Sequence, residues 1–230
     1  MTLQLTGINH QYPSPLGKPR QILKDINWDI KGGSQILLRG VSGSGKTTLF
    51  NIIAGLMQPS SGTVTLDGTD IYGLSESKRD RFRSTHIGYV FQTHHLLPTL
   101  SARENVVMPM VYGKRFPQAE HKTRAEFLLE QVGLDSFGNY LPRQLSTGQR
   151  MRVAVARALA NQPMLLLSDE PTASLDEESA NQVMDLMQSI AEKEKAILLV
   201  SSHDPALMTR FTQHANLAQG HLAVQEVTPS

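Results

Sequence analysis

Residues 40–47 read Gly-Val-Ser-Gly-Ser-Gly-Lys-Thr, and this octapeptide decides the fold. It matches the pattern G-x4-G-K-[ST]. The run Ile36-Leu37-Leu38 before it is continuously apolar, as expected for a strand buried on both faces. The residues after it predict a helix from about Lys46 to Ala54. The stretch therefore predicts a buried strand, a glycine-rich loop and a helix in direct succession, which is the beginning of an α/β fold.

The glycine-rich loop has the composition of a phosphate-binding loop. Glycines keep side chains away, so successive backbone N–H groups converge on phosphate oxygens, and the helix adds the partial positive charge of its N-terminus. Lys46 supplies a full positive charge to the β- and γ-phosphates, and the Thr47 hydroxyl is offered to Mg²⁺. The alternative is a glycine-rich turn that binds nothing, but the strand and helix around it favour the phosphate loop. The expected nucleotide contacts here are Gly40, Val41, Ser42, Gly43, Ser44, Gly45, Lys46, Thr47 and Thr48.

A second apolar strand, residues 165–167, runs into Ser168-Asp169-Glu170. Packing alone does not place two carboxylates at the end of a buried strand, because an unpaired buried charge is costly. Asp169 fits the acid that orients Mg²⁺ in P-loop NTPases. Glu170 then lies near the γ-phosphate, where it is able to polarise water as a general base. The alternative is a strand end that carries two solvated acids.

A third polar motif, Leu-Ser-Thr-Gly-Gln at residues 145–149, precedes a helix predicted over residues 149–160. A serine hydroxyl and a glycine amide at a helix N-terminus make a second anion site. One chain does not need two phosphate sites for one nucleotide, whereas in a dimer each second site closes on the nucleotide of the other chain. The alternative is an N-cap, which explains Ser146 but not Gly148 and Gln149.

The composition is that of an ordinary globular chain. Of the 230 residues 40% are hydrophobic and 19% are charged, which excludes a disordered or fibrous protein. A net charge of +1 leaves no polybasic field, so no nucleic acid is expected as a partner. The lack of cysteine excludes a disulfide framework and favours a reducing compartment. No signal peptide and no apolar run of about 18 residues is found, so a membrane role is expected through a partner.

The pattern of apolar residues divides the chain. Residues 93–161 are expected to form an all-helical insert, in which Ser101 and Glu104 have the spacing of a capping box. Ser174 and Glu177 have the same spacing before a later helix. The other expected elements are strands at 3–8, 25–30, 63–66, 87–91, 164–167 and 196–201, an exposed helix at 76–83 and a hairpin at 216–224.

Together these motifs resemble the ATP-binding subunits of ABC transporters, in the order of that family and over nearly the whole chain. Walker A is then residues 40–47, the signature is 145–149 and Walker B is 164–169. The resemblance implies one ABC ATPase domain over residues 1–230, with an α/β, RecA-like P-loop NTPase core, an antiparallel β subdomain and an inserted α-helical subdomain. The implied core is 1–92 and 162–230, and the helical subdomain is 93–161 with the signature.

The resemblance also implies the roles of single residues. Glu170 would position water, His203 would contact the γ-phosphate, and Gln92 would link Mg²⁺ and water to the helical insert. Tyr12 would stack on adenine; the alternative is an aromatic residue that shields the core. The implied catalytic residues are Lys46, Gln92, Glu170 and His203, the implied Mg²⁺ ligands are Thr47, Gln92 and Asp169, and the implied D-loop is Ser174-Leu175-Asp176.

In the implied assembly two chains enclose two ATP molecules head to tail. Ser146, Gly148 and Gln149 of one chain would face the γ-phosphate held by Lys46 of the other. The implied partners are an integral-membrane permease and a second copy of this chain, with the ATPase on the cytoplasmic face of the inner or plasma membrane.

Three positions depart from the usual pattern. Thr147 stands where the signature has glycine, and a β-branched residue is comfortable only at negative φ, so the backbone is expected to approach the γ-phosphate less closely. Ser168 and Ser202 replace alanine and threonine, which are of similar size. The charged nucleotide-contacting positions all remain, so an active ATPase is expected.

Residues 75–83 and 88–106 are similar to the group that serves lipoprotein release and macrolide export. The expected function is therefore to bind and hydrolyse ATP and so energise a permease for transport or extrusion. One alternative is an ABC ATPase of a membrane complex in cell division or signalling. Another is a soluble ABC factor that acts on nucleic acid or ribosomes, which the single Walker A motif, the single signature and the net charge of +1 disfavour.

Overall fold

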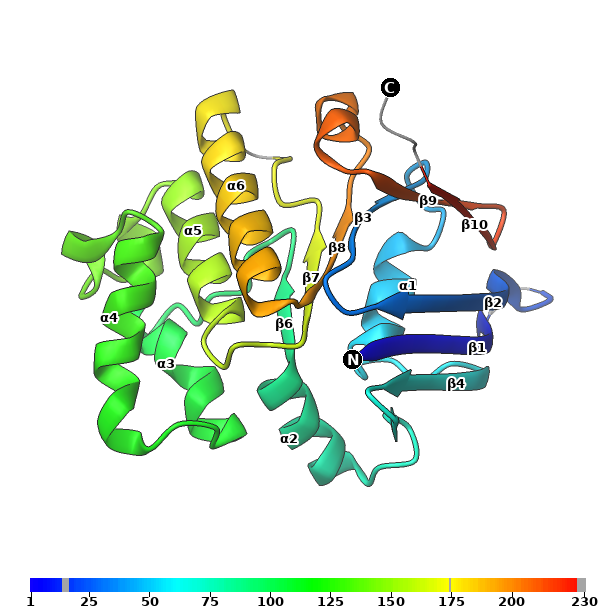
Figure 1. The fold of residues 1–230 in the computed structure, drawn as a ribbon, viewed down its shortest axis with the longest axis horizontal. Helices are drawn as coiled ribbons and strands as arrows, with labels where there is room; N and C mark the ends of the chain where they lie inside the picture. The colour runs from blue at the N-terminus through cyan, green and yellow to red at the C-terminus, as the bar shows by residue number, and fades with distance from the viewer. Residues whose placement is uncertain (14–16, 174, 227–230) are drawn as a thin grey trace.

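Two β-sheets and a group of helices make up the structure, a computed structural model that describes residues 1–13, 17–173 and 175–226 (Figure 1). The antiparallel sheet has the order β2-β1-β4-β5, and its strands are β1 (Thr2–Tyr12), β2 (Arg20–Lys31), β4 (Ser61–Leu66) and β5 (Thr69–Asp70). The larger sheet has the order β10-β9-β3-β8-β7-β6. Its strands are β3 (Gln35–Arg39), β6 (Ile87–Val90), β7 (Leu165–Asp169), β8 (Ile197–Ser201), β9 (Gln213–Ala218) and β10 (His221–Glu226).

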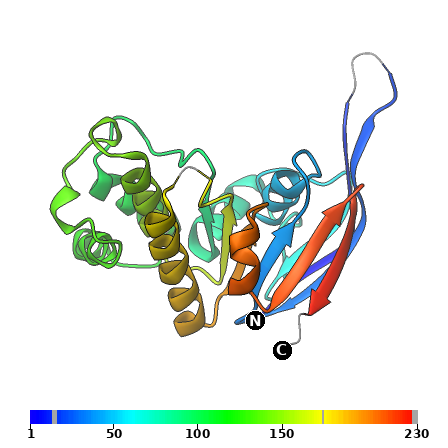
Figure 2. The same cartoon turned by 90° about the horizontal axis from the view of Figure 1, so that it is seen from above.

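The helices lie mainly on one side of the larger sheet. They are α1 (Lys46–Ile53), α2 (Glu76–His86), α3 (Ala102–Gly113), α4 (His121–Gln131), α5 (Thr147–Ala158) and α6 (Glu177–Glu194). Short 3₁₀ turns are η1 (Gln118–Glu120), η2 (Asp135–Phe137), η3 (Pro142–Gln144) and η4 (Pro205–Arg210). Seen from above, α3, α4 and α5 form one end of the molecule and the antiparallel sheet the other, with the parallel strands between them (Figure 2).

The central strands are buried on both faces, as their continuous apolar runs predict. In β7, Leu166 packs into a core shared with α3–α6, whereas Leu165 and Leu167 face a second core that contains α1 and the antiparallel sheet. The same alternation divides β3, in which Leu37 belongs to the first core and Leu38 to the second. The larger sheet is therefore the middle layer of the domain, because each of its faces has a core of its own.

The topology brings the chemistry-bearing residues to one edge. Strands β3, β8, β7 and β6 are neighbours and parallel, so their carboxyl ends lie side by side. β3 leads into the glycine-rich loop at Gly40, β7 ends at Asp169, β8 ends at Ser201, and Gln92 follows β6. In a sheet of this kind ligands bind outside the carboxyl ends of the strands.

Helix starts show where local patterns succeed and fail. The capping box at Ser101 is confirmed, since Glu104 N donates to Ser101 Oγ at 3.3 Å and Ser101 N donates to Glu104 Oε2 at 2.8 Å. The second predicted capping box is wrong: α6 begins at Glu177 with Asp176 as its N-cap. Asp176 accepts from Ser179 N at 2.9 Å, and a carboxylate caps a helix N-terminus as well as a serine does. Ser174 lies outside the described residues.

The terminal hairpin is confirmed: Ala218 pairs with His221 across the two-residue turn Gln219-Gly220, and both turn residues have positive φ. Between Val90 and Leu165, a segment that the structure describes in full, all regular elements are helical. In the described parts of the chain, no helix has both the length and the apolar character that crossing a bilayer requires.

Candidate nucleotide site

A cleft of about 870 Å³ lies outside the carboxyl ends of the central strands. Its lining unites most of the residues that the sequence singles out, although they come from five separate parts of the chain. The lining residues are Tyr12, Pro13, Arg20, Ile22, Val41, Ser42, Gly43, Ser44, Gly45, Lys46, Thr47, Thr48, Gln92, Asp169, Glu170 and His203. The volume is within the usual range for a small-molecule site.

The loop between β3 and α1 has a backbone that only glycine fits at two positions. Gly45, the N-cap of α1, has φ +105, and a Cβ there would lie 2.7 Å from Ile22 Cγ2. At Gly40 a Cβ would lie 2.6 Å from the carbonyl oxygen of Leu217. The glycines therefore allow the loop to lie tightly against its neighbours, with the N-terminus of α1 beside the cleft.

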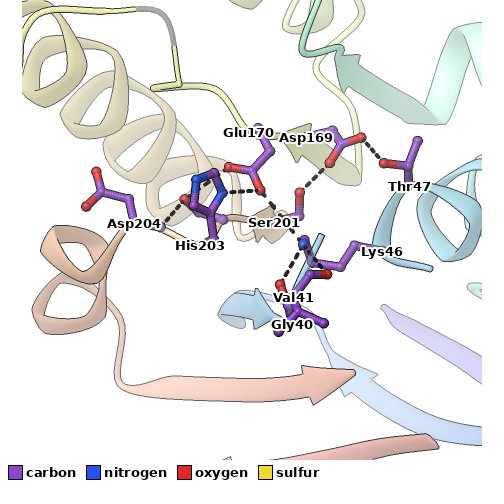
Figure 3. Close-up of polar contacts among 10 residues, drawn as sticks. Gly40, Val41, Lys46, Thr47, Asp169, Glu170, Ser201, His203 and Asp204 are labelled. Atoms are coloured by element: carbon purple, nitrogen blue, oxygen red, sulfur yellow. Dashed lines mark hydrogen bonds and ion pairs between the residues drawn. The ribbon is translucent and has the colours of Figure 1, made fainter. Parts of the chain in front are cut away.

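Lys46 is buried and its ammonium group lies inside this loop (Figure 3). Nζ donates to Gly40 O at 2.7 Å and lies 3.5 Å from Val41 O and 3.9 Å from Glu170 Oε1. A cation that is held by carbonyl oxygens next to a helix N-terminus is well placed to bind an anionic ligand.

Asp169 joins three elements through its two carboxylate oxygens (Figure 3). Thr47 Oγ1, at the start of α1, donates to Oδ2 at 2.7 Å, and Ser201 Oγ, at the end of β8, donates to Oδ1. Burial and the nearby Asp169 carboxylate raise the pKa of Tyr89, so that phenol stays protonated. A hydroxyl and a carboxylate in contact are oxygen donors of the kind Mg²⁺ prefers, so the residues present fit this ion.

Glu170 has an unusual backbone. Its φ is +49, in the left-handed region that a glutamate rarely adopts, while its amide still donates to Ser201 O at 3.0 Å. Its Oε1 lies 3.0 Å from His203 Nδ1, and its Oε2 accepts from Ser202 Oγ at 3.4 Å (Figure 3). Strain of this kind persists where the surrounding structure holds it, often at functional sites. The turn directs a buried carboxylate at the space beside Lys46.

Tyr12 and Gln92 lie at the rim of the cleft. The Tyr12 hydroxyl is 3.2 Å from Thr48 Oγ1, which fixes the ring beside the start of α1, and the ring is 39% exposed. The ring packs against that of His10 in a T-shaped contact. Gln92 is exposed at the point where the chain leaves β6 for the helical segment.

The third motif does not lie at this cleft. Ser146 is the N-cap of α5, and Gln149 completes a capping box, because Gln149 Oε1 accepts from Ser146 N at 2.8 Å and Ser146 Oγ accepts from Gln149 N at 3.2 Å. The helix thus begins at Thr147, two residues before its predicted start, and the cap explains Gln149 as well as Ser146. Gly148 is left without a local structural role, since a Cβ there would meet only ordinary contacts with Ser179 and Leu175.

Thr147 fits its position without strain. It is the first residue of α5 and does not occur among the described residues with positive φ. Its hydroxyl accepts from Arg150 Nη2 at 3.0 Å. The helix at this point needs no left-handed residue, so the β-branched side chain costs nothing in backbone conformation.

Sequence reasoning missed Ser201. Its hydroxyl holds the carboxylate of Asp169, whereas sequence reasoning assigns a role in that segment only to His203 and notes Ser202 only as a replacement of similar size. The available signal was a hydroxyl residue at the end of a buried strand that neighbours β7.

A family model described as ABC transporter matches residues 23–173. The chain belongs to the ABC transporter family, as an ATP-binding domain. It is 38% identical to the lipoprotein-releasing system ATP-binding protein LolD of Hydrogenovibrio crunogenus over 229 residues, which cover 99% of this chain and 98% of that protein. It is 42% identical to an uncharacterized ABC transporter ATP-binding protein, YvrO, of Bacillus subtilis, over 97% of this chain and 96% of that protein.

The fold agrees with this family. The dimeric post-hydrolysis state of the ATP-binding cassette MJ0796, bound to ADP and Pi, superposes with a TM-score of 0.92 at 33% identity over 99% of this chain and 100% of that chain. The prediction of an α/β P-loop NTPase fold is therefore confirmed, and this ABC domain is an ATP-binding ATPase.

The position of Tyr12 gives a first testable prediction. Base–aromatic stacking is worth roughly 1–3 kcal/mol, so Tyr12→Ala is expected to weaken ATP binding about tenfold. Tyr12→Phe keeps the ring and loses only the contacts of the hydroxyl with Thr48 and Met57, so binding should change by about twofold or less. Calorimetric titration with a non-hydrolysable ATP analogue measures both. An equal loss in the two variants would show that the hydroxyl, and not the ring, is what matters.

Proposed function

We propose that this chain is the ATPase subunit that energises a membrane permease, working as a head-to-tail dimer on the cytoplasmic face of the membrane. The observation that carries the proposal is the separation of two half-sites in one chain. Lys46, Asp169 and Glu170 line the cleft, whereas Ser146 and Gly148 lie at the start of α5, outside its lining. The similar cassette MJ0796 is described as a dimer with ADP and Pi.

In this proposal each residue of the cleft has one task. The loop amides and Lys46 bind the β- and γ-phosphates, and Thr47, Asp169 and Gln92 hold Mg²⁺. When bound, Mg²⁺ neutralises charge on the phosphate oxygens. Glu170 accepts a proton from the attacking water, and His203, which touches Glu170 through Nδ1, orients that carboxylate and meets the γ-phosphate.

The second half-site would act across the dimer. The Ser146 hydroxyl and the Gly148 amide at the N-terminus of α5 would approach the γ-phosphate bound by the other chain. The closed dimer would then depend on the γ-phosphate, and it would open when hydrolysis removes that phosphate. The role of Gln149 in this contact would require its side chain to leave the capping box.

We also propose that residues 1–92 and 162–230 form the core and 93–161 a helical subdomain, and that the permease docks between them. A largely apolar groove of about 350 Å³ lies there, lined in part by Leu97, Met108 and the exposed Tyr112. Its lining, as far as the described residues go, has no aspartate or glutamate and contains two arginines. Arg83 is paired at 2.9 Å with Asp80, which lies outside the lining, whereas Arg157 has no carboxylate partner among the ion pairs of the described residues. The groove therefore favours a short apolar segment that carries an acidic residue.

The relatives of this chain point to the transport system. Several are lipoprotein-releasing system ATP-binding proteins, including one from Rhodospirillum rubrum that is 43% identical over 206 residues. We propose a permease of that group as the partner. The permease selects the transported substrate, because the ATPase contributes no residue to the membrane pathway in this arrangement.

The general-base role predicts the effect of Glu170→Gln. Loss of the base is expected to lower ATP hydrolysis at least about 100-fold, while ATP binding remains, because the phosphate loop and Lys46 are untouched. Phosphate release and nucleotide titration measure the two properties. Glu130→Gln, at an exposed position of α4, is the matched control and should hydrolyse normally. Hydrolysis by Glu170→Gln at the control rate would remove Glu170 from the mechanism.

The head-to-tail arrangement predicts complementation. Ser146→Asp keeps the N-cap and places a negative charge beside the phosphate, so its homodimer should be inactive, as should that of Lys46→Ala. Mixed dimers of these two variants contain one intact site, so ATPase activity should reappear. The double variant mixed with wild-type chains has no intact site in its mixed dimers and is the control. Activity of the Ser146→Asp homodimer near the wild-type level would contradict the trans contact.

The permease proposal is tested by affinity capture from detergent-solubilised native membranes, with the captured proteins identified by mass. A membrane-spanning protein at stoichiometric yield is expected with the wild-type chain. Tyr112→Glu should abolish capture by placing a carboxylate in the groove, whereas Tyr140→Glu, at another exposed tyrosine of the helical segment, should not. A chain that stays in the soluble fraction without a membrane partner would favour the nucleic-acid or ribosome alternative.

A further inference from the structure

Arg157 crosses from helix α5 to the loop that follows Gln92. It lies in the last turn of α5, the helix that Ser146 begins. Its Nη1 donates to His95 O and its Nη2 donates to His94 O, both at 2.6 Å. Both contacts span more than 60 positions in sequence, so they join two segments that local structure does not connect.

The loop has an uncommon shape at the two residues that accept these bonds. His94 and His95 have φ +63 and +47, two consecutive left-handed residues without glycine. Each such residue costs roughly 1 kcal/mol or more, so contacts elsewhere must hold the turn. Successive residues of one helical hand present their carbonyls to the same side, where the planar fork of a guanidinium is able to reach both.

The loop is also tied to the core on its other side. The His95 ring stacks on Phe91 at 4.7 Å, and Phe91 stacks on Tyr89 at 3.9 Å. The Tyr89 hydroxyl lies 3.3 Å from Asn51 Oδ1 of α1, the helix that follows the phosphate loop. Continuous contacts therefore lead from α1, through the loop after Gln92, to the end of α5.

Arg157 has no carboxylate partner among the ion pairs of the described residues. Burial lowers the pKa of its guanidinium to about 10, so it remains a cation at neutral pH. The two carbonyl groups are what compensates this partly buried charge, and hydrogen bonds to a charged donor are the strong kind. Loss of the guanidinium would leave both the strained turn and α5 without this connection.

We propose that Arg157 is a positioning residue that fastens α5 to the loop after Gln92, so that the two move as one body. α5 is a single helix of 12 residues, so a displacement of its last turn is transmitted to Ser146 at its other end. The conformation of the Gln92 loop, set by nucleotide in its own chain, then places Ser146 for the nucleotide of the other chain. This inference rests on the proposed head-to-tail function.

The test measures ATP-dependent dimer formation by light scattering in the Glu170→Gln background, because in that variant the dimer is not lost through ATP hydrolysis and dissociation. Arg157→Gln is expected to raise the ATP concentration at half-maximal dimer formation about tenfold. ATP binding to the monomer should change by about twofold or less, because Arg157 does not line the nucleotide cleft. Arg157→Lys, which retains the charge but not the fork, should be shifted by about threefold.

Arg124→Gln is the matched control. Arg124 of α4 also donates to two successive carbonyls, those of Leu159 and Ala160, but these contacts join α4 to the residues after α5 and do not involve the loop after Gln92. Its loss should lower thermal stability to a similar degree and leave the ATP concentration for dimer formation within about twofold. Equal shifts in Arg124→Gln and Arg157→Gln would overturn the positioning role, since general loosening would then explain both.

The possible failures are distinguishable. If the Glu170→Gln chain with Arg157 intact forms no dimer with ATP, the head-to-tail function is overturned together with this inference. If that dimer forms and Arg157→Gln forms it at the same ATP concentration, only the inference is overturned. Should Arg157→Gln not fold, Arg157→Lys decides: a shift of about threefold supports the positioning role, and no shift overturns it.

Discussion

A single buried carboxylate organises the nucleotide site. Asp169 receives one hydroxyl from the first turn of α1 and another from the end of β8, while its own backbone belongs to β7. Three elements from different parts of the chain are thereby held together at one point, at the edge of the sheet. A carboxylate so deeply buried is stable only because both oxygens are hydrogen-bonded, so its partners are structural requirements as well as candidate ligands.

The sequence predicts those parts of the fold that depend on local pattern. The buried strands, the phosphate loop, the capping box at Ser101 and the terminal hairpin each follow from neighbouring residues, and the structure has all of them. The predicted start of α6 is misplaced because serine and aspartate are both favoured N-cap residues, and the sequence offers Ser174 and Asp176 only two positions apart. The local pattern does not decide between them. For a related reason the sequence assigns only Ser146 to an N-cap at residues 145–149, whereas in the structure Gln149 takes part in the cap as well.

The site residues that sequence reasoning omits are those defined by contacts across the fold. Ser201 matters because β8 lies beside β7, and Arg157 matters because its guanidinium reaches a turn more than 60 positions earlier. Neither strand order nor the direction of a long side chain is encoded in a short motif. The motifs thus identify what the chemistry needs, whereas the tertiary structure shows what holds those groups in place.

The backbone of Glu170 has a consequence for how this sequence can change. At φ +49 glycine or asparagine would be the more comfortable residue, so stability by itself favours replacing the glutamate. The side chain is kept against the preference of its own backbone. In a descendant that no longer needed to hydrolyse ATP, substitution at position 170 would stabilise the fold. The loss of ATPase activity would then be accompanied by a higher melting temperature.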